Sequence, residues 1–258
     1  MDIARRALDA APAGLLTDFD GTLSTIVADP ASASLVEGAQ DALATLAERL
    51  AVVAIVSGRG ALDARRLVGV PGVLVAGNHG TEWLWPDAAA PEPDPRMGEI
   101  RERLDALVAR VPPLPGVRVE HKGLSATVHY RQAPDPAAAR EAIHAALAAA
   151  GDGGIERRDG LMSVELRPRG IGDKGEAARR IIDRYGLRGV VVLGDDVTDL
   201  DMFAAVAERR ARGELEGAIV AVGGAEREVP PDVAAAADVI LDGPASAARL
   251  LAALADDR

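Results

Sequence analysis

The chain has 258 residues, a formal net charge of −11 and a hydrophobic content of 48%. This length suffices for one large domain or two modest ones with a substantial core. The excess of acidic residues argues against nucleic acid or an anionic membrane as a partner, and the absence of cysteine excludes disulfides, thiolate metal sites and cysteine nucleophiles.

The N-terminal segment, residues 1–13, carries four charged side chains and lacks the apolar stretch of a signal peptide. Nowhere does an apolar run approach the roughly 20 residues that a membrane-spanning helix requires. We therefore expect a cytoplasmic protein without a membrane partner.

Short apolar runs alternate with alanine-rich helical segments in the two terminal parts of the chain. Uninterrupted apolar runs are typical of strands buried on both faces, and their alternation with helices predicts a doubly wound parallel sheet, a Rossmann-like α/β fold. The predicted strands are Gly14–Thr17, Ala51–Val56, Val73–Ala76, Val190–Leu193, Ala218–Val222 and Val239–Leu241, and the predicted helices are Val36–Arg49, Leu62–Val68, Lys174–Tyr185 and Asp199–Arg212.

The middle of the chain has a different pattern, which begins with a proline- and aspartate-rich stretch, Trp85–Arg96, that indicates a linker. Polar and apolar residues then alternate, which predicts an antiparallel sheet with one face in water. We therefore predict a core domain of residues 1–94 and 170–258 and an inserted, smaller α+β domain of residues 95–169. Its predicted helices are Met97–Arg110 and Asp135–Ala150, and its hairpins are Val117–His121 with Leu124–Arg131 and Gly154–Arg158 with Leu161–Arg167, the second turning at Asp159-Gly160.

Two aspartates, Asp18 and Asp20, follow the first predicted strand and are separated by a single residue. Residues i and i+2 of a strand project to the same side, so the two carboxylates repel each other unless a cation lies between them or one is protonated. Phosphoryl transfer uses such a pair, because one carboxylate attacks phosphorus, Mg²⁺ offsets the charge and the second acid manages protons. An Asp-Gly turn after a strand is the structural alternative.

Two further polar segments directly follow predicted strands, at the edge where open α/β sheets bind ligands. Ser57-Gly58-Arg59 offers a hydroxyl beside flexible backbone, which suits a phosphate oxygen, although a serine N-cap is the alternative. The segment Gly194–Asp199 contains three carboxylates, which suit Mg²⁺, although an acidic N-cap of the next helix explains them too.

Lys174 opens a predicted helix, where a cation opposes the helix dipole, so a nearby anion would explain its placement. It is one of only two lysines in a chain that otherwise uses arginine. A solvated lysine is the alternative.

In order and context, these segments resemble the four motifs of the haloacid dehalogenase-like phosphohydrolases, and the resemblance covers essentially the whole chain. It implies that Asp18 is the nucleophile and forms an aspartyl-phosphate. It implies that Asp20 protonates the leaving oxygen, then activates the hydrolytic water, and also offers its backbone carbonyl to the metal.

The same resemblance implies that Ser57, Gly58 and Lys174 bind the phosphate, with Lys174 also offsetting the charge of Asp18. Mg²⁺ is the implied cofactor. The implied metal ligands, or supports of the metal and its waters, are Asp18, Asp20, Asp195, Asp196 and Asp199.

Within this superfamily the chain resembles the trehalose-6-phosphate phosphatases, through Gly77–Glu82, Val119–Ser125, His129–Arg131 and Val164–Pro168. In that family an inserted cap domain recognises glucose hydroxyls with acidic and basic side chains. The resemblance implies a small-molecule sugar phosphate as substrate and a functional link to a trehalose-6-phosphate synthase. Carried over residue by residue, Glu120, Lys122 and Glu165 contact the sugar and His79 lies near the phosphate-side sugar.

These residues have simpler explanations. Glu120 and Lys122 also fit an exposed pair beside a hairpin turn, and Glu165 fits a surface pair with Arg167. Whether His129 shares a face with Glu120 depends on the hairpin register, which the sequence leaves open.

Other functions remain open at this stage. A nearby alternative is a phosphatase for another sugar phosphate, such as glucosyl- or mannosyl-3-phosphoglycerate or sucrose phosphate. A phosphomutase returns the phosphoryl group to a sugar, but its relatives usually carry a small helical cap in another position. A pseudoenzyme is disfavoured because every residue type that the chemistry needs is present.

Overall fold

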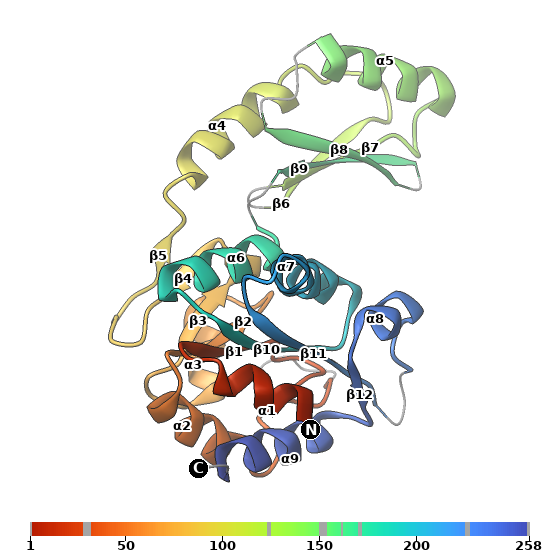
Figure 1. Cartoon of the computed structure of the whole chain (residues 1–258). Helices are drawn as coiled ribbons and strands as arrows, with labels where there is room; N and C mark the ends of the chain where they lie inside the picture. The colour runs from red at the N-terminus through yellow and green to blue at the C-terminus, as the bar shows by residue number, and fades with distance from the viewer. Residues whose placement is uncertain are drawn as a thin grey trace. The chain divides into compact units, whose positions relative to one another are not determined.

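The chain folds into two compact units, which a computed structural model describes for residues 2–27, 32–122, 125–149, 154–160, 162–169, 172–224 and 228–256 (Figure 1). The core unit consists of Met1–Pro93 and Gly172–Arg258, and the inserted unit consists of Asp94–Ile171. Among the described residues, no helix combines the length and the apolar character needed to cross a bilayer.

The core unit is built on an eight-stranded sheet with the strand order β12-β11-β10-β1-β2-β3-β4-β5. All pairs from β12 to β3 are parallel, and β4 and β5 extend this edge in antiparallel pairing. This architecture confirms the predicted doubly wound fold. The strands are β1 Ala13–Thr17, β2 Val52–Val56, β3 Leu74–Gly77, β4 Glu82–Leu84, β5 Glu92–Pro93, β10 Gly189–Gly194, β11 Glu216–Val222 and β12 Val239–Leu241.

Helices cover both faces of this sheet. Because successive strand residues point to opposite faces, Leu15 belongs to one apolar cluster and its neighbour Leu16 to the other. The first cluster includes residues of α1 Asp2–Asp9, α2 Ala39–Arg49, α3 Ala61–Val68 and α9 Pro244–Asp256, and the second includes residues of α6 Lys174–Tyr185, α7 Leu200–Ala211 and α8 Pro231–Ala236.

One prediction about this unit needs correction, and three helices were missed. The stretch Trp85–Arg96, predicted as a linker, contributes β5 to the sheet, and its Pro93 is tolerated because an edge strand leaves one side unpaired. The helices α1, α8 and α9 were not predicted at all.

Two tryptophans attach α6 to the antiparallel edge of the sheet. The buried Trp83 of β4 stacks on Trp85, with ring centroids 5.5 Å apart. From α6, the guanidinium of Arg180 lies 4.3 Å from the centroid of Trp83, and that of Arg184 lies 4.0 Å from the centroid of Trp85. These cation–π contacts fix the helix that begins with Lys174.

The inserted unit is a four-stranded antiparallel sheet in the order β6-β7-β9-β8 with two helices. Its apolar cluster combines Ala126 and Val128 of β7 with the helical residues Leu104 and Ile143, so the helices pack on one face of the sheet. Its elements are α4 Met97–Val108, β6 Arg118–Lys122, β7 Ser125–His129, α5 Pro136–Ala149, β8 Ile155–Gly160 and β9 Ser163–Pro168.

The second hairpin turns later than predicted. Asp159 pairs with Val164 and Gly160 with Ser163, so the predicted turn residues belong to β8. The Asp159 carboxylate bonds Arg140 of α5 at 2.6 Å, a tertiary contact that favours the strand over the turn. The turn predicted at Lys122-Gly123 in the first hairpin involves residues outside the described part of the chain.

We expect Trp83→Ala to lower the free energy of unfolding by about 3–5 kcal/mol, because it removes a buried aromatic ring that also contacts Arg180. The measurement is urea unfolding followed by circular dichroism. Trp85→Ala, at a half-buried position, is the matched control and should cost less than half as much. Equal losses for both variants would contradict the anchoring role of Trp83.

Candidate active site

The polar motifs of the core unit meet in one cavity at the carboxyl edge of the parallel strands. Asp18 follows β1 and its backbone N–H donates to the carbonyl of Leu193 in β10, at 3.0 Å. Ser57 follows β2 and Asp195 follows β10. The cavity has a volume of about 550 Å³, and its polar lining includes Asp18, Asp20, Ser57, Arg59, Asp63, His79, Lys174, Asp195, Asp196 and Thr198.

A buried ammonium lies between two buried carboxylates at the centre of the site. Lys174 Nζ donates to Asp18 Oδ1 at 2.7 Å and to Asp199 Oδ1 at 2.6 Å. Burial lowers the pKa of Lys174, but the charges of Asp18 and Asp199 outweigh burial and raise it. Lys174 is therefore a charged group of the site and not a solvated surface lysine.

Asp18 lies in an unfavourable electrostatic environment. Burial raises its pKa to about 8, the Lys174 charge opposes the shift, and the charges of Asp199 and Asp195 reinforce it. The described residues donate no hydrogen bond to its second carboxylate oxygen, so this oxygen remains available for chemistry.

Asp195 approaches the backbone of the first motif very closely. Its Oδ1 accepts a hydrogen bond from Thr22 at 3.1 Å. Gly21 has a φ of +83°, and a Cβ there would lie 2.2 Å from Asp195 Oδ2. Only glycine fits this position, which explains the glycine of the Asp18–Leu23 segment.

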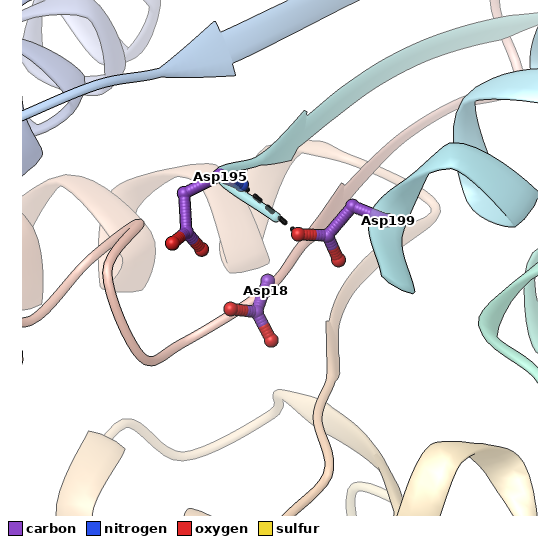
Figure 2. A group of neighbouring side chains, drawn as sticks. All are labelled: Asp18, Asp195 and Asp199. Carbon is purple, nitrogen blue, oxygen red and sulfur yellow. Dashed lines mark hydrogen bonds between the residues drawn. The ribbon is translucent and has the colours of Figure 1, made fainter. Parts of the chain in front are cut away.

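Asp199 lies beside Asp195 and is hydrogen-bonded to its backbone (Figure 2). Its Oδ2 accepts hydrogen bonds from the backbone N–H groups of Asp195 at 2.9 Å and Asp196 at 3.1 Å, while its Oδ1 accepts from Lys174. The Asp196 carboxylate caps the turn by accepting from the N–H of Val197 at 2.8 Å. Asp199 thus shapes the loop. Asp196 acts as an N-cap, which is the alternative explanation that the sequence offered for the acids of this segment.

Three of the predicted metal-site carboxylates form a cluster that suits a divalent cation. One oxygen each of Asp18, Asp195 and Asp199 lie within 4.8 Å of one another, and all three residues are buried. Three carboxylates facing the single Lys174 ammonium leave an excess of two negative charges when all are ionised. Hard carboxylate oxygens and this excess charge fit Mg²⁺. In the described part of the chain, the side chains of Asp20 and Asp196 are not members of this cluster.

Ser57 and His79 come together through a strained loop. The N–H of His79 donates to the Ser57 carbonyl at 2.9 Å, and both Asn78 and His79 have positive φ. A Cβ on Gly58 would lie 3.0 Å from the imidazole, so glycine lets the ring pack closely against the backbone. The Ser57 hydroxyl accepts from the N–H of Arg59 at 3.2 Å, and the described residues offer no acceptor for its proton.

Asp20 forms a two-pronged ion pair with Arg59, a residue to which the sequence assigned no role. Arg59 Nε donates to Asp20 Oδ2 at 2.6 Å, and Nη2 donates to Oδ1 at 2.7 Å. The Asp20 carboxylate raises the pKa of Arg59, which therefore stays charged. The position directly after Ser57-Gly58 was the available sequence signal for this residue.

In the inserted unit, two predicted sugar-binding residues lie in one row across the polar face of the sheet. Glu120 is opposite Thr127, and Thr127 is opposite Glu165. Residues directly opposite each other share a face, and this face is the one that alternates with the apolar cluster. The row ends at Arg158, which is opposite Glu165. The side chain of Lys122 lies outside the described part of the structure.

The register answers the question that the sequence left open about His129. This residue is opposite Arg118, and its Nε2 lies 3.0 Å from Glu120 Oε2. His129 therefore shares the polar face with Glu120 and contacts it.

Comparison with solved structures defines the class of fold. A haloacid dehalogenase-like hydrolase from Bacteroides thetaiotaomicron matches with a TM-score of 0.55 over 93% of this chain and 98% of that chain, at 15% identity. The protein shares this fold, and its acidic cavity lies at the carboxyl edge of the strands, where such a sheet binds ligands.

The trehalose-phosphatase family model matches residues 16–232, and the chain belongs to this family. The trehalose-phosphate phosphatase of Mycobacterium avium is 39% identical over 248 residues, which are 93% of this chain and 61% of that relative. The chain thus spans about three fifths of the length of this curated relative. The structure of Aspergillus fumigatus trehalose-6-phosphate phosphatase is 27% identical, with a TM-score of 0.75 over 99% of this chain and 97% of that chain.

Without a metal ion, the Asp18 carboxyl should make stability depend on pH. Its pKa is raised from 3.8 to about 8 on folding, so its contribution to stability is complete below pH 3.8 and is lost as pH rises towards 8. We expect the melting temperature of the metal-free protein to fall by at least about 5 °C relative to Asp18→Asn across this window, with Mg²⁺ reversing the loss.

The Asp18→Asn variant is the matched control, because it removes the titrating group and keeps the shape. Differential scanning calorimetry at several pH values, with EDTA or Mg²⁺, gives the comparison. A difference between the two proteins that stays constant with pH would contradict this account of Asp18.

Proposed function

We propose that this chain is a Mg²⁺-dependent phosphatase that hydrolyses trehalose 6-phosphate to trehalose and phosphate. The observation that carries the proposal is the meeting of Asp18, Ser57, Lys174 and Asp195 in one cavity of a trehalose-phosphatase family member. Phosphoryl transfer depends on in-line positioning of the reacting groups and on neutralisation of the phosphate charge more than on special covalent chemistry. This cavity offers a carboxylate for attack and groups that bind and neutralise phosphate oxygens.

In the first step, the free oxygen of Asp18 attacks phosphorus while the bond between phosphorus and the sugar oxygen breaks. Asp20 donates a proton to that sugar oxygen. Lys174 and the Ser57 hydroxyl donate hydrogen bonds to phosphate oxygens. In the second step, Asp20 takes a proton from water, whose oxygen attacks the aspartyl-phosphate and releases Asp18 and inorganic phosphate.

The metal site of this proposal is formed by Asp18 and Asp195, with Asp199 supporting the loop and the backbone carbonyl of Asp20 as a further ligand. Bound there, Mg²⁺ would offset the negative charge of the phosphate and of the carboxylates. Asp199 uses both of its oxygens for Lys174 and backbone N–H groups, which supports an indirect role for it.

We propose that the inserted unit is the substrate-specificity cap of the enzyme. Glu120 and Glu165 present carboxylates on one sheet face, and such groups accept hydrogen bonds from sugar hydroxyls. Lys122 would donate to the sugar, and His79, which lines the core cavity, would lie near the phosphate-side sugar. The cytoplasmic location and the link to a trehalose-6-phosphate synthase remain predictions from the sequence.

One observation favours a second candidate, a phosphatase for a sugar phosphate with an additional carboxylate, such as glucosyl-3-phosphoglycerate. Arg118 and Arg131 line a cavity of about 740 Å³ on the inserted unit together with Glu120, His129 and Ser163. Two arginines exceed what an uncharged disaccharide needs, but they suit a carboxylate.

We expect rapid phosphate release from trehalose 6-phosphate with Mg²⁺ and complete loss of this activity with EDTA. Asp18→Asn should lower kcat at least roughly 10⁴-fold, because an amide cannot attack phosphorus. The panel includes sucrose 6-phosphate, glucosyl-3-phosphoglycerate and glucose 6-phosphate. Asp41→Asn, on the exposed side of α2, is the matched control and should leave the rate unchanged. Preference for another member of the panel would keep the chemistry and overturn the substrate.

We expect Glu165→Ala to lower kcat/KM for trehalose 6-phosphate about 100-fold or more, while kcat/KM for a small aryl phosphate changes little. A missing partner for a sugar hydroxyl matters only for a substrate that has the hydroxyl. Steady-state kinetics on both substrates gives the comparison. Equal losses on both would remove Glu165 from sugar recognition.

A further inference from the structure

We propose that Arg59 is the positioning residue of Asp20, fixing its carboxylate for proton transfer to and from the reacting oxygens. This inference rests on the proposed phosphatase function and assigns a role to a residue which that mechanism does not use. The carrying observation is the pair of short contacts, 2.6 Å and 2.7 Å, between two nitrogens of Arg59 and the two oxygens of Asp20.

The pairing geometry determines where Asp20 points. Two parallel N–H···O bonds to one carboxylate fix its position and also the plane in which its oxygens lie. A single hydrogen bond would leave the carboxylate free to rotate. The Asp20 side chain is 39% exposed, so packing alone does not immobilise it.

Arg59 is itself anchored by groups outside the reacting set. Its Nη1 donates to Asp63 of α3 at 3.1 Å, and its guanidinium lies 5.5 Å from the centroid of the buried Phe19 ring. Its backbone carbonyl accepts from the N–H of Asn78 at 2.7 Å. The guanidinium is therefore a fixed support, with a side chain only 12% exposed.

The charges around Asp20 give the Arg59 guanidinium a second role, which is electrostatic. Asp18 and Asp195 line the same cavity as Asp20, and like charges repel. Lys174 is committed to Asp18 and Asp199, so it does not compensate Asp20. Arg59 lines this cavity too, and its positive charge at both Asp20 oxygens offsets the repulsion from Asp18 and Asp195 and holds the carboxylate in place.

The same contacts are compatible with both proton transfers. A protonated Asp20 oxygen donates its proton to the sugar oxygen as the bond from that oxygen to phosphorus breaks, while the other oxygen stays bonded to Arg59. The resulting carboxylate accepts both Arg59 hydrogen bonds, as in this structure, until it takes a proton from the attacking water. Arg59 thus keeps one contact throughout and never transfers a proton itself.

The test compares leaving groups. An alkoxide needs a proton to leave, whereas a nitrophenolate does not, so loss of Asp20 positioning should affect only the first kind of substrate. We expect Arg59→Ala to lower kcat/KM about 100-fold or more for trehalose 6-phosphate and less than about 3-fold for p-nitrophenyl phosphate. The ratio kcat/KM is the right quantity because it reports on the steps up to departure of the leaving group.

Three comparisons separate positioning from a structural role. Arg59→Lys keeps a charge but lacks the two-pronged geometry, so it should lose nearly as much as Arg59→Ala. Added guanidine should restore part of the Arg59→Ala activity on the sugar phosphate. Arg66→Ala, which removes an exposed arginine that bonds Asp63 at 2.8 Å, is the matched control and should behave as wild type.

A double-mutant cycle with Asp20→Asn completes the design. If Arg59 acts through Asp20, the double variant should be no slower on the sugar phosphate than Asp20→Asn alone. Additive losses, or equal losses on both substrates, would overturn the positioning role and leave Arg59 as a structural or phosphate-binding residue. Wild-type protein that hydrolyses neither substrate would instead overturn the phosphatase function, and the Arg59 role with it.

Discussion

Lys174 places a buried ammonium between two buried carboxylates, 2.7 Å from Asp18 and 2.6 Å from Asp199. Burial of a lone charge costs several kcal/mol, and the ammonium offsets this cost for both carboxylates. The position of that ammonium depends on α6, which begins at Lys174 and is fixed to β4 by the arginine–tryptophan contacts. The stacked tryptophan rings at the sheet edge therefore help to hold the helix that places the ammonium beside the two carboxylates.

The strand order explains why distant parts of the chain supply one site. β1 lies between β2 and β10, so the residues that follow these three strands emerge side by side at the carboxyl edge. Gly21 then lets the first loop approach Asp195 more closely than any side chain would permit. Backbone geometry thus brings the carboxylates of Asp18 and Asp195 together. Their mutual repulsion has to be compensated by positive charge, and the single ammonium of Lys174 compensates only part of it.

The sequence predicted those features that depend on local pattern. Uninterrupted apolar runs located the six parallel strands, and the acids, serine and lysine beside them located the cavity.

Features that depend on tertiary contacts were missed. Nothing local distinguishes Asp159 as a strand residue from Asp159 as a turn residue, whereas its contact with Arg140 of α5, which favours the strand, is tertiary. The pairing of Arg59 with Asp20 was invisible for the same reason, since 39 positions separate them. The helices α1, α8 and α9 went unpredicted, and α8 has only six residues, too few for a clear helical periodicity.

The two acids of the first motif illustrate how one short segment can hold two different kinds of carboxylate. Asp18 is buried and bonded to an ammonium through one oxygen, and the other oxygen accepts no hydrogen bond from the described residues, as its proposed role in attack requires. Asp20 is partly exposed and bonded through both oxygens to a guanidinium, as suits its proposed role of exchanging protons with the leaving group and with water. A lysine ammonium is a compact point charge, whereas a guanidinium fixes a plane. In the mechanism that we propose, the nucleophile mainly needs charge compensation and the proton carrier mainly needs a fixed orientation. A lysine beside the first and an arginine beside the second fit these two needs.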